Sequence, residues 1–216
     1  MNREIFQKGV IFDLDGTLID SMGMWENLCE RFLRAQGITP PPDLRDTLWT
    51  MDLDECARYL VATFPLPLTP EETISAIHEM IRNAYRDEIP AKPGALALLD
   101  ALDRANIPVC LATATDRVIF SPALERLGID KYFCFTHTCA EAQKSKRDPQ
   151  IYLDCAEFLA LPPQELVVVE DTLHAASTAK RAGFTVIGVR DPYSAQDWAG
   201  LSRLCDRFVD SLEALL

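Results

Sequence analysis

The chain has 216 residues, of which 33 are Asp or Glu and 21 are Lys or Arg, so its formal net charge is −12. A surface that binds nucleic acid or an anionic membrane needs a basic face, and this charge balance therefore argues against both partners. The hydrophobic fraction of 48% is enough to build a sizeable core in one domain, or in one domain with an inserted segment.

The cysteines and the opening residues indicate a cellular compartment. The seven cysteines form neither a Cys-x-x-Cys pair nor a zinc-ligand spacing, and their odd number and apolar surroundings predict reduced core thiols. The opening stretch MNREIFQKG is charged and lacks the apolar run of a signal peptide. No window approaches 18 uncharged apolar residues, so we expect no membrane span and a cytoplasmic protein.

The first predicted element is a strand over residues 9–13, where the apolar run of Val10, Ile11 and Phe12 ends in Asp13. About 90 residues separate it from the next clear strand pattern, whereas a simple strand–helix–strand unit takes roughly 30 residues in all. The interval is helical in pattern throughout, and prolines interrupt it near residues 40 and 65. We therefore predict a helical insertion over residues 21–89, directly after the first strand.

From residue 90 onward, strand and helix patterns alternate. A helix over residues 90–106 precedes predicted strands at 107–113, 132–135, 165–171 and 184–189, and helical patterns separate them at 115–128, 148–161 and 172–183. Gly128 and Gly183 follow two of these helices as C-terminal caps do, and Asp148 before Pro149 indicates a helix start. The alternation predicts an α/β fold with a doubly wound, Rossmann-like parallel sheet formed by residues 1–20 and 90–216.

Polar residues end three of the predicted strands: Asp13 and Asp15, then Thr113, then Glu170 and Asp171. The carboxyl ends of neighbouring parallel strands share one edge of a sheet, so we expect the four carboxylates to converge there. Their repulsion would be costly without a counter-ion, and a hard divalent cation such as Mg²⁺ would remove it. Asp13 is the natural nucleophile toward phosphorus, and Asp15 could protonate a leaving oxygen and then deprotonate water.

Four segments resemble the motifs of the haloacid dehalogenase-like hydrolase superfamily, in the family's order: DLDGTL (13–18), VCLATAT (109–115), SKRDPQIYL (145–153) and VVVEDTLHAASTAKRAGF (167–184). The resemblance implies that the Thr113 hydroxyl, the Ala114 N–H and the Lys146 ammonium bind phosphoryl oxygens. It also implies that Mg²⁺ is held by the carboxylates of Asp13, Glu170 and Asp171 and by the backbone carbonyl of Asp15.

The resemblance is not perfect at every position. Four residues depart from the family pattern without removing a charged or nucleophilic group: Ser145, Arg147, Thr172 and Ala175. Lys144 lies two residues from Lys146 and is an alternative third-motif lysine, but the spacing to Pro149 and Tyr152 favours Lys146.

The resemblance also implies the kind of reaction. In this superfamily an aspartate two residues after the nucleophile, here Asp15, implies phosphate monoester hydrolysis or phosphomutase chemistry. The insertion resembles the helical cap of subfamily I, which closes over a small phosphorylated metabolite and here offers the candidate contacts Trp25, Arg45, Trp49 and Met51. We therefore expect a Mg²⁺-dependent phosphatase, a phosphoric monoester hydrolase, that acts through an aspartyl phosphate on a sugar phosphate, a phosphoglycolate-like acid or a nucleotide.

Two other hypotheses stay open. A β-phosphoglucomutase-like mutase would share the core motifs, but it carries a Gly-x-Ser-Arg stretch that the comparable segment LWTMDLDECARYL (48–60) lacks. A non-catalytic binding module is expected to have lost Asp13, Asp15 or the metal-binding acids, and this chain retains them. The sequence leaves the substrate and the oligomeric state open, with a monomer plausible.

Overall fold

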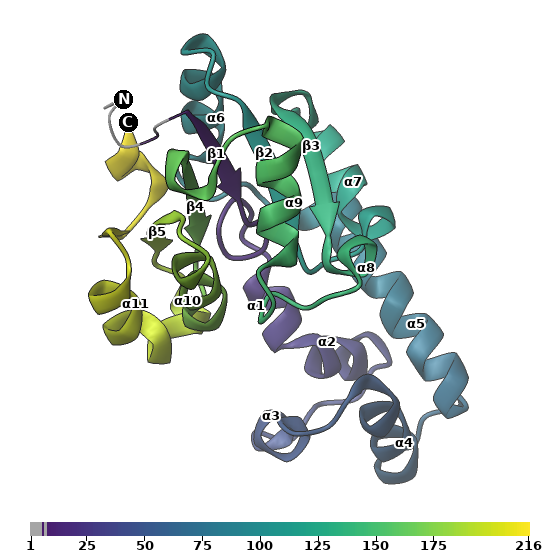
Figure 1. The fold of residues 1–216 in the computed structure, drawn as a ribbon. Coiled ribbons are helices and arrows are strands. Elements are labelled where there is room, and N and C mark those ends of the chain that lie inside the picture. Colours follow the sequence, from purple (N-terminus) through teal and green to yellow (C-terminus); the bar gives the residue numbers. More distant parts are fainter. Residues whose placement is uncertain (1–5, 7) are drawn as a thin grey trace.

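A six-stranded parallel sheet forms the centre of the structure, a computed structural model that describes residues 6 and 8–216 (Figure 1). In their order across the sheet, the strands are β3 (Phe133–Thr138), β2 (Val109–Thr113), β1 (Gly9–Phe12), β4 (Leu166–Glu170), β5 (Thr185–Val189) and β6 (Arg207–Val209). The first five confirm the predicted strands within a few residues. The three-residue strand β6 was not predicted.

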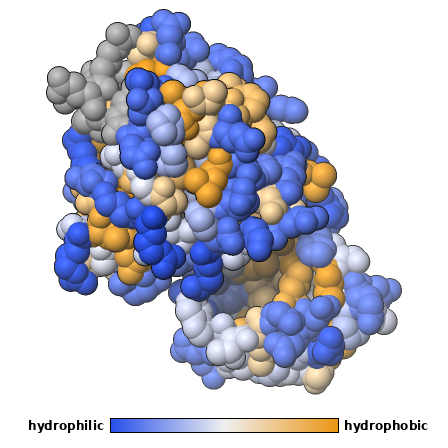
Figure 2. Space-filling view, viewed as in Figure 1, coloured by the Kyte–Doolittle hydropathy of each residue, from blue (hydrophilic) through white to orange (hydrophobic). Residues whose placement is uncertain are grey.

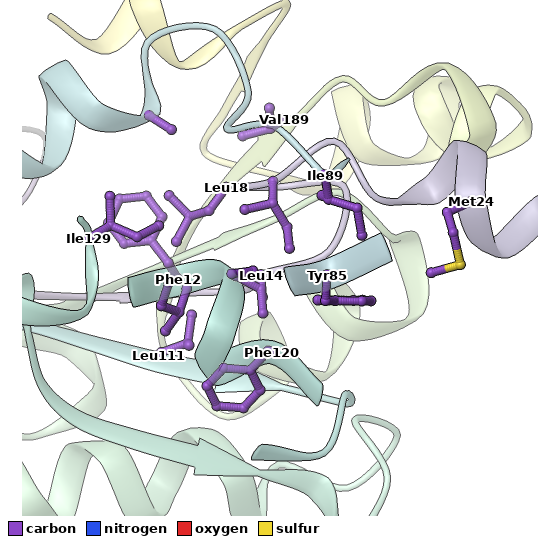
Figure 3. Close-up of a cluster of buried hydrophobic side chains, with 14 of the residues drawn as sticks. Phe12, Leu14, Leu18, Met24, Tyr85, Ile89, Leu111, Phe120, Ile129 and Val189 are labelled. Atoms are coloured by element: carbon purple, nitrogen blue, oxygen red, sulfur yellow. The ribbon is translucent and has the colours of Figure 1, made fainter. Parts of the chain in front are cut away.

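The central strand β1 supplies both faces of the core, as its uninterrupted apolar run predicts. Val10 and Phe12 join one buried cluster, and Ile11 joins the other. Figure 3 shows the first cluster around Phe12 and Leu14. Because each buried side chain of this size contributes roughly 1.5–3 kcal/mol, β1 is a rigid support for the residues that follow it.

Helices cover both faces of the sheet. They are α6 (Ala95–Arg104) and α7 (Arg117–Leu127) on one face, and α9 (Gln150–Leu159), α10 (Leu173–Arg181) and α11 (Trp198–Leu204) on the other. The connections include α8 (Cys139–Ala142) and 3-10 turns at Asp130–Tyr132, Pro163–Glu165, Pro192–Asp197 and Leu212–Leu215. Gly128 caps α7 with a left-handed backbone (φ 67°), as predicted, and the arrangement confirms the doubly wound α/β fold.

The segment inserted after β1 is helical. It contains α1 (Met22–Glu26), α2 (Leu28–Ala35), α3 (Leu44–Leu48), α4 (Leu53–Thr63), α5 (Pro70–Asn83) and a π-helical turn at Ala84–Glu88. Capping boxes begin α4 at Asp52 and α5 at Thr69. Figure 1 shows α1 to α5, which we call the cap, on the side of the sheet toward which the arrowheads of β1 and β3 point. The residue limits proposed for the two domains stay a prediction.

The cysteine prediction is only partly confirmed. All seven are free thiols, and Cys56, Cys110 and Cys155 are buried. Cys134 is exposed, so its predicted place in the core is wrong: the register between β2 and β3 shifts there, and the extra residue bulges out of the edge strand. Within the described part of the chain, no helix combines the length and the apolar character needed to cross a membrane.

Candidate active site

Three buried carboxylates meet where β1 and β4 end. One oxygen atom from each of Asp13, Glu170 and Asp171 lies within 4.8 Å of the other two. The Lys146 ammonium reaches them from the loop before α9, where it donates hydrogen bonds to Asp13 and, at 2.5 Å, to Glu170. The Tyr152 hydroxyl on α9 donates to the same Glu170 oxygen at 2.9 Å. Two parallel strand ends, together with α9 and the loop before it, therefore bring together residues from three distant segments of the chain.

The structure distinguishes the two candidate lysines. Lys146 is buried and contacts two of the carboxylates, whereas Lys144 is exposed and lies 3.8 Å from the Asp148 carboxylate at the surface. Burial alone would lower the pKa of Lys146, but the charges of Asp13 and Glu170 together raise it well above its ordinary value. The ammonium therefore stays charged among the acids.

A single ammonium does not balance this cluster. Burial raises the pKa of Asp13 to about 7, against the opposing attraction of Lys146 and with a further contribution from Glu170. Burial and then the charge of Asp13 raise the pKa of Asp171 well above its ordinary range. The three carboxylates carry more negative charge than Lys146 can neutralise, so the protein alone disfavours their full ionisation.

A divalent cation fits the composition of this cluster. All three candidate ligands are carboxylate oxygens, the donor type that hard cations such as Mg²⁺ and Ca²⁺ prefer. The Ser194 hydroxyl donates to Asp171 at 3.1 Å and orients the carboxylate from outside the cluster. Gly16 approaches so closely that a Cβ atom at this position would lie 2.5 Å from an Asp171 oxygen. The acidic group is therefore a candidate metal site.

The Asp15 side chain has different partners. Its Oδ1 atom accepts hydrogen bonds from the hydroxyls of Ser21, at 2.6 Å, and Tyr85. Its Oδ2 atom accepts from the hydroxyls of Thr115, at 2.7 Å, and Thr113, at 3.5 Å. Asp15 therefore lies outside the group of three carboxylates, although its charge also contributes to the raised pKa of Asp13, and its place in the metal site stays a prediction. The strand ends at Phe12, and Asp15 lies beyond it, directly before the turn at Gly16 (φ 81°), with partners next to β2 and in the segments that join the cap to the sheet.

The predicted site residues thus form two adjoining groups. Asp13, Lys146, Glu170 and Asp171 make the acidic cluster. Thr113 is buried at the end of β2 and is one of the hydroxyl residues around Asp15, and the exposed Ala114 directly follows it. The metal contact predicted for the Asp15 backbone carbonyl stays a prediction.

Several residues of the site were not predicted from the sequence. Those that contact the predicted acids are Ser21, Tyr85, Thr115, Tyr152 and Ser194. Thr115 has a usable signal, because it lies two residues after Thr113 within the same motif. Tyr85 has none, because 70 residues separate it from Asp15. Burial and then the Asp15 charge raise the pKa of Tyr85, so its hydroxyl remains a donor.

A cavity of about 270 Å³ lies among the cap helices α1 to α4. Figure 2 shows the cap as a lobe with a hollow that is partly walled by hydrophobic residues. The candidate contacts Trp25, Arg45, Trp49 and Met51 all line this cavity. Arg45 pairs with the Glu26 carboxylate and lies 5.7 Å from the centre of the Trp49 ring.

The cavity wall is linked to the site by hydrogen bonds. The indole Nε1 of Trp25 donates to the Tyr85 hydroxyl at 2.9 Å, and that hydroxyl donates to Asp15. Two successive hydrogen bonds therefore join the wall of the cap cavity to the Asp15 carboxylate.

Comparison with known proteins identifies one family and several related proteins. The family model "haloacid dehalogenase-like hydrolase" matches residues 7–183. The chain is 31% identical over 185 residues to "Hexitol phosphatase A" of Escherichia coli K12, covering 86% of this chain and 84% of that protein. It is 30% identical over 192 residues to "Phosphoglycolate phosphatase" of Agrobacterium fabrum, covering 85% and 81%. A "putative beta-phosphoglucomutase" crystal structure from Thermotoga maritima superposes with a TM-score of 0.84 at 26% identity, covering 96% of both chains.

Proposed function

Because this chain belongs to the haloacid dehalogenase-like hydrolases and is a phosphoric monoester hydrolase, we propose that it cleaves a small phosphorylated metabolite through an aspartyl phosphate on Asp13, with Mg²⁺ at the acidic cluster. The observation that carries the proposal is the placement of Asp13. Its carboxylate is buried on a rigid strand end, contacts Lys146 and lies beside Glu170 and Asp171.

The two aspartates divide the chemistry between them. An Asp13 oxygen attacks phosphorus, and the new O–P bond forms as the P–O bond to the leaving group breaks. Asp15 gives a proton to the departing oxygen. A water molecule then attacks the phosphoryl group and gives a proton to Asp15, and the bond to Asp13 breaks. The products are the alcohol, inorganic phosphate and the free Asp13 carboxylate.

The remaining residues stabilise charge. Lys146 would contact one phosphoryl oxygen while it restrains Asp13, and Thr113 with the Ala114 N–H would contact others at the end of β2. Mg²⁺, held by the carboxylates of Asp13, Glu170 and Asp171, would neutralise negative charge that Lys146 alone does not balance. Phosphoryl transfer depends mainly on such positioning and charge stabilisation.

The cap cavity suggests what kind of group leaves. Its lining is mostly apolar and includes two indole rings. Among the described residues that line it, Arg45 is the one cation, and Glu26 already pairs with it. A second anionic group on the substrate would therefore lack a free counter-charge. We favour an uncharged leaving group with apolar surface, such as a sugar or a nucleoside, over a phosphoglycolate-like acid.

A mutase is the second candidate. The likeness to the Thermotoga maritima structure supports it, because that protein is described as a putative β-phosphoglucomutase. The absence of the Gly-x-Ser-Arg stretch from residues 48–60 counts against it. Hydrolysis and isomerisation give different products, so one panel of substrates separates the two.

The test is phosphate release by the purified protein with Mg²⁺ and a panel of sugar phosphates, nucleotides and phosphoglycolate. We expect release of inorganic phosphate, and Asp13→Asn should abolish it. Asp100→Asn, which changes a half-buried carboxylate on α6 that pairs with Arg104, is the matched control and should keep full activity. Isomerisation of a sugar phosphate without phosphate release would identify the mutase. Failure of every substrate, with no phosphoenzyme formed, would identify a non-catalytic binding module.

A further inference from the structure

The two donors on Asp15 Oδ1 lie in the two segments that join the cap to the sheet. Ser21 directly precedes α1, and Tyr85 lies in the π-helical turn that follows α5. The donors on Oδ2, Thr113 and Thr115, instead come from the end of β2 in the sheet. The two oxygens of one carboxylate are therefore held by different parts of the molecule.

Tyr85 is firmly embedded. Its side chain is fully buried, and Figure 3 shows its ring in the same apolar cluster as Leu14 and Ile89. Arg126 on α7 donates to the backbone carbonyl of Tyr85 at 3.2 Å and to that of Arg86 at 2.7 Å, which ties the π-helical turn to the helices of the sheet. The Tyr85 hydroxyl therefore has a fixed position relative to Asp15.

Trp25 gives the same hydroxyl a second partner. Its indole N–H donates to the Tyr85 oxygen at 2.9 Å, and the two rings meet edge to face with centroids 6.3 Å apart. Since the hydroxyl has one proton, this contact directs that proton to Asp15 Oδ1. Trp25 also lines the cap cavity, so the contact reaches the place proposed for the leaving group.

We propose that Tyr85 is a positioning residue for Asp15, which it orients so that Oδ2 carries the proton given to the leaving oxygen; the inference rests on the proposed phosphatase function. In protonated Asp15, one oxygen is a carbonyl-type acceptor and the other bears the proton. Each oxygen has two hydroxyl donors, but Trp25 directs the Tyr85 proton to Oδ1, whereas the threonine hydroxyls on Oδ2 can rotate, so Oδ1 is the acceptor. The proton is then on Oδ2, and the threonine hydroxyls beside it are free to turn toward a phosphoryl group.

The test compares two esters that differ in their need for a proton. The p-nitrophenolate of p-nitrophenyl phosphate leaves as a stable anion, whereas the alkoxide of glycerol 2-phosphate needs protonation as it leaves. In Tyr85→Phe we expect kcat/KM for glycerol 2-phosphate to fall by about tenfold to a hundredfold, a part of what general acid catalysis contributes. For p-nitrophenyl phosphate we expect a loss of less than about threefold, because kcat/KM reports formation of the phosphoenzyme.

Tyr152→Phe is the matched control. It removes another buried tyrosine hydroxyl beside the site, but one that contacts Glu170 and not Asp15. Whatever its size, its effect should be similar for the two esters. A loss in Tyr85→Phe that is equal for both esters, or no loss for glycerol 2-phosphate, would overturn the proposal.

A crystal structure of Tyr85→Phe gives a readout that does not depend on turnover. We expect the Asp15 carboxylate to rotate away from its position in the wild type, and an unchanged carboxylate would contradict the positioning role. A wild-type protein that releases phosphate from no substrate of the panel and forms no phosphoenzyme would contradict the proposed function instead. The crystal structure would then decide the inference, as it would for a wild type that hydrolyses neither of these two esters. Thermal unfolding of the variant confirms that it is folded.

Discussion

Replacing Asp13 by asparagine is expected to make the metal-free protein more stable above pH 7 while it abolishes activity. Burial raises the pKa of Asp13 to about 7 in the folded protein, from an ordinary value of 3.8. Between these two pH values the folded state keeps a proton that the unfolded state has released, so raising the pH through this window favours unfolding. Above about pH 7 the loss of folding stability is complete and does not grow further.

The structure sets the size of this effect. A pKa difference of about three pH units corresponds to about 4 kcal/mol, which is an upper limit because relaxation of the folded protein and entry of water lessen the cost of a buried charge. We therefore expect Asp13→Asn to gain about 1–3 kcal/mol at pH 8 and roughly a third of that gain at pH 5, where the unfolded carboxyl has already lost its proton. Urea unfolding in the presence of EDTA at both pH values measures the difference, with Asp100→Asn as the control. The same pH dependence in wild type and Asp13→Asn would refute the reasoning.

Three further predictions concern other parts of the chain. Lys146→Met should lower kcat/KM by about a hundredfold to a thousandfold, whereas Lys144→Met, which changes an exposed side chain, should leave steady-state rates unchanged. The Arg117 guanidinium and then the capping contacts of α8 hold the pKa of Glu141 at about 2, so its stabilising contribution is complete above pH 4.5 and is lost as the pH falls toward 2. Glu141→Gln should cost about 0.5 kcal/mol at pH 7 in urea unfolding, because this ion pair is well exposed to solvent. A variant whose stability changes between pH 2 and 5 as it does in the wild type would contradict this. Gly16→Ala should destabilise the protein by more than about 1 kcal/mol and lower activity, because φ is 81° and the new Cβ would meet a carboxylate of the acidic cluster; an unchanged melting temperature would speak against it.

The acidic cluster could be predicted from sequence because topology brings it together. Asp13 directly follows β1 and Glu170 is the last residue of β4, and these adjacent parallel strands end at the same edge. That argument needs the strand positions alone and no side-chain detail. The third-motif resemblance then identified Lys146 correctly over Lys144 as the lysine in the cluster.

The surroundings of Asp15 could not be predicted in this way. The alternation of side chains along an extended strand applied only as far as Phe12, because the chain turns at Gly16. Tyr85 contacts Asp15 only because the helical insertion of about 60 residues ends back beside the sheet. No local sequence pattern predicts where that insertion ends in space. The edge strand β6 was missed for a related reason, since its three residues depend on pairing with β5.

Asp13 and Asp15 are two residues apart, and their environments are opposed. Asp13 is fixed on a buried strand end, where burial and neighbouring acids oppose its ionisation and Lys146 opposes them. Asp15 is held by hydroxyl groups, two of which lie where the chain enters and leaves the cap. Under the proposed mechanism, a change in the cap can therefore alter proton transfer at Asp15 without moving Asp13. Substitutions at the cap connections should consequently affect substrates according to their leaving groups, whereas substitutions in the acidic cluster should affect all substrates alike.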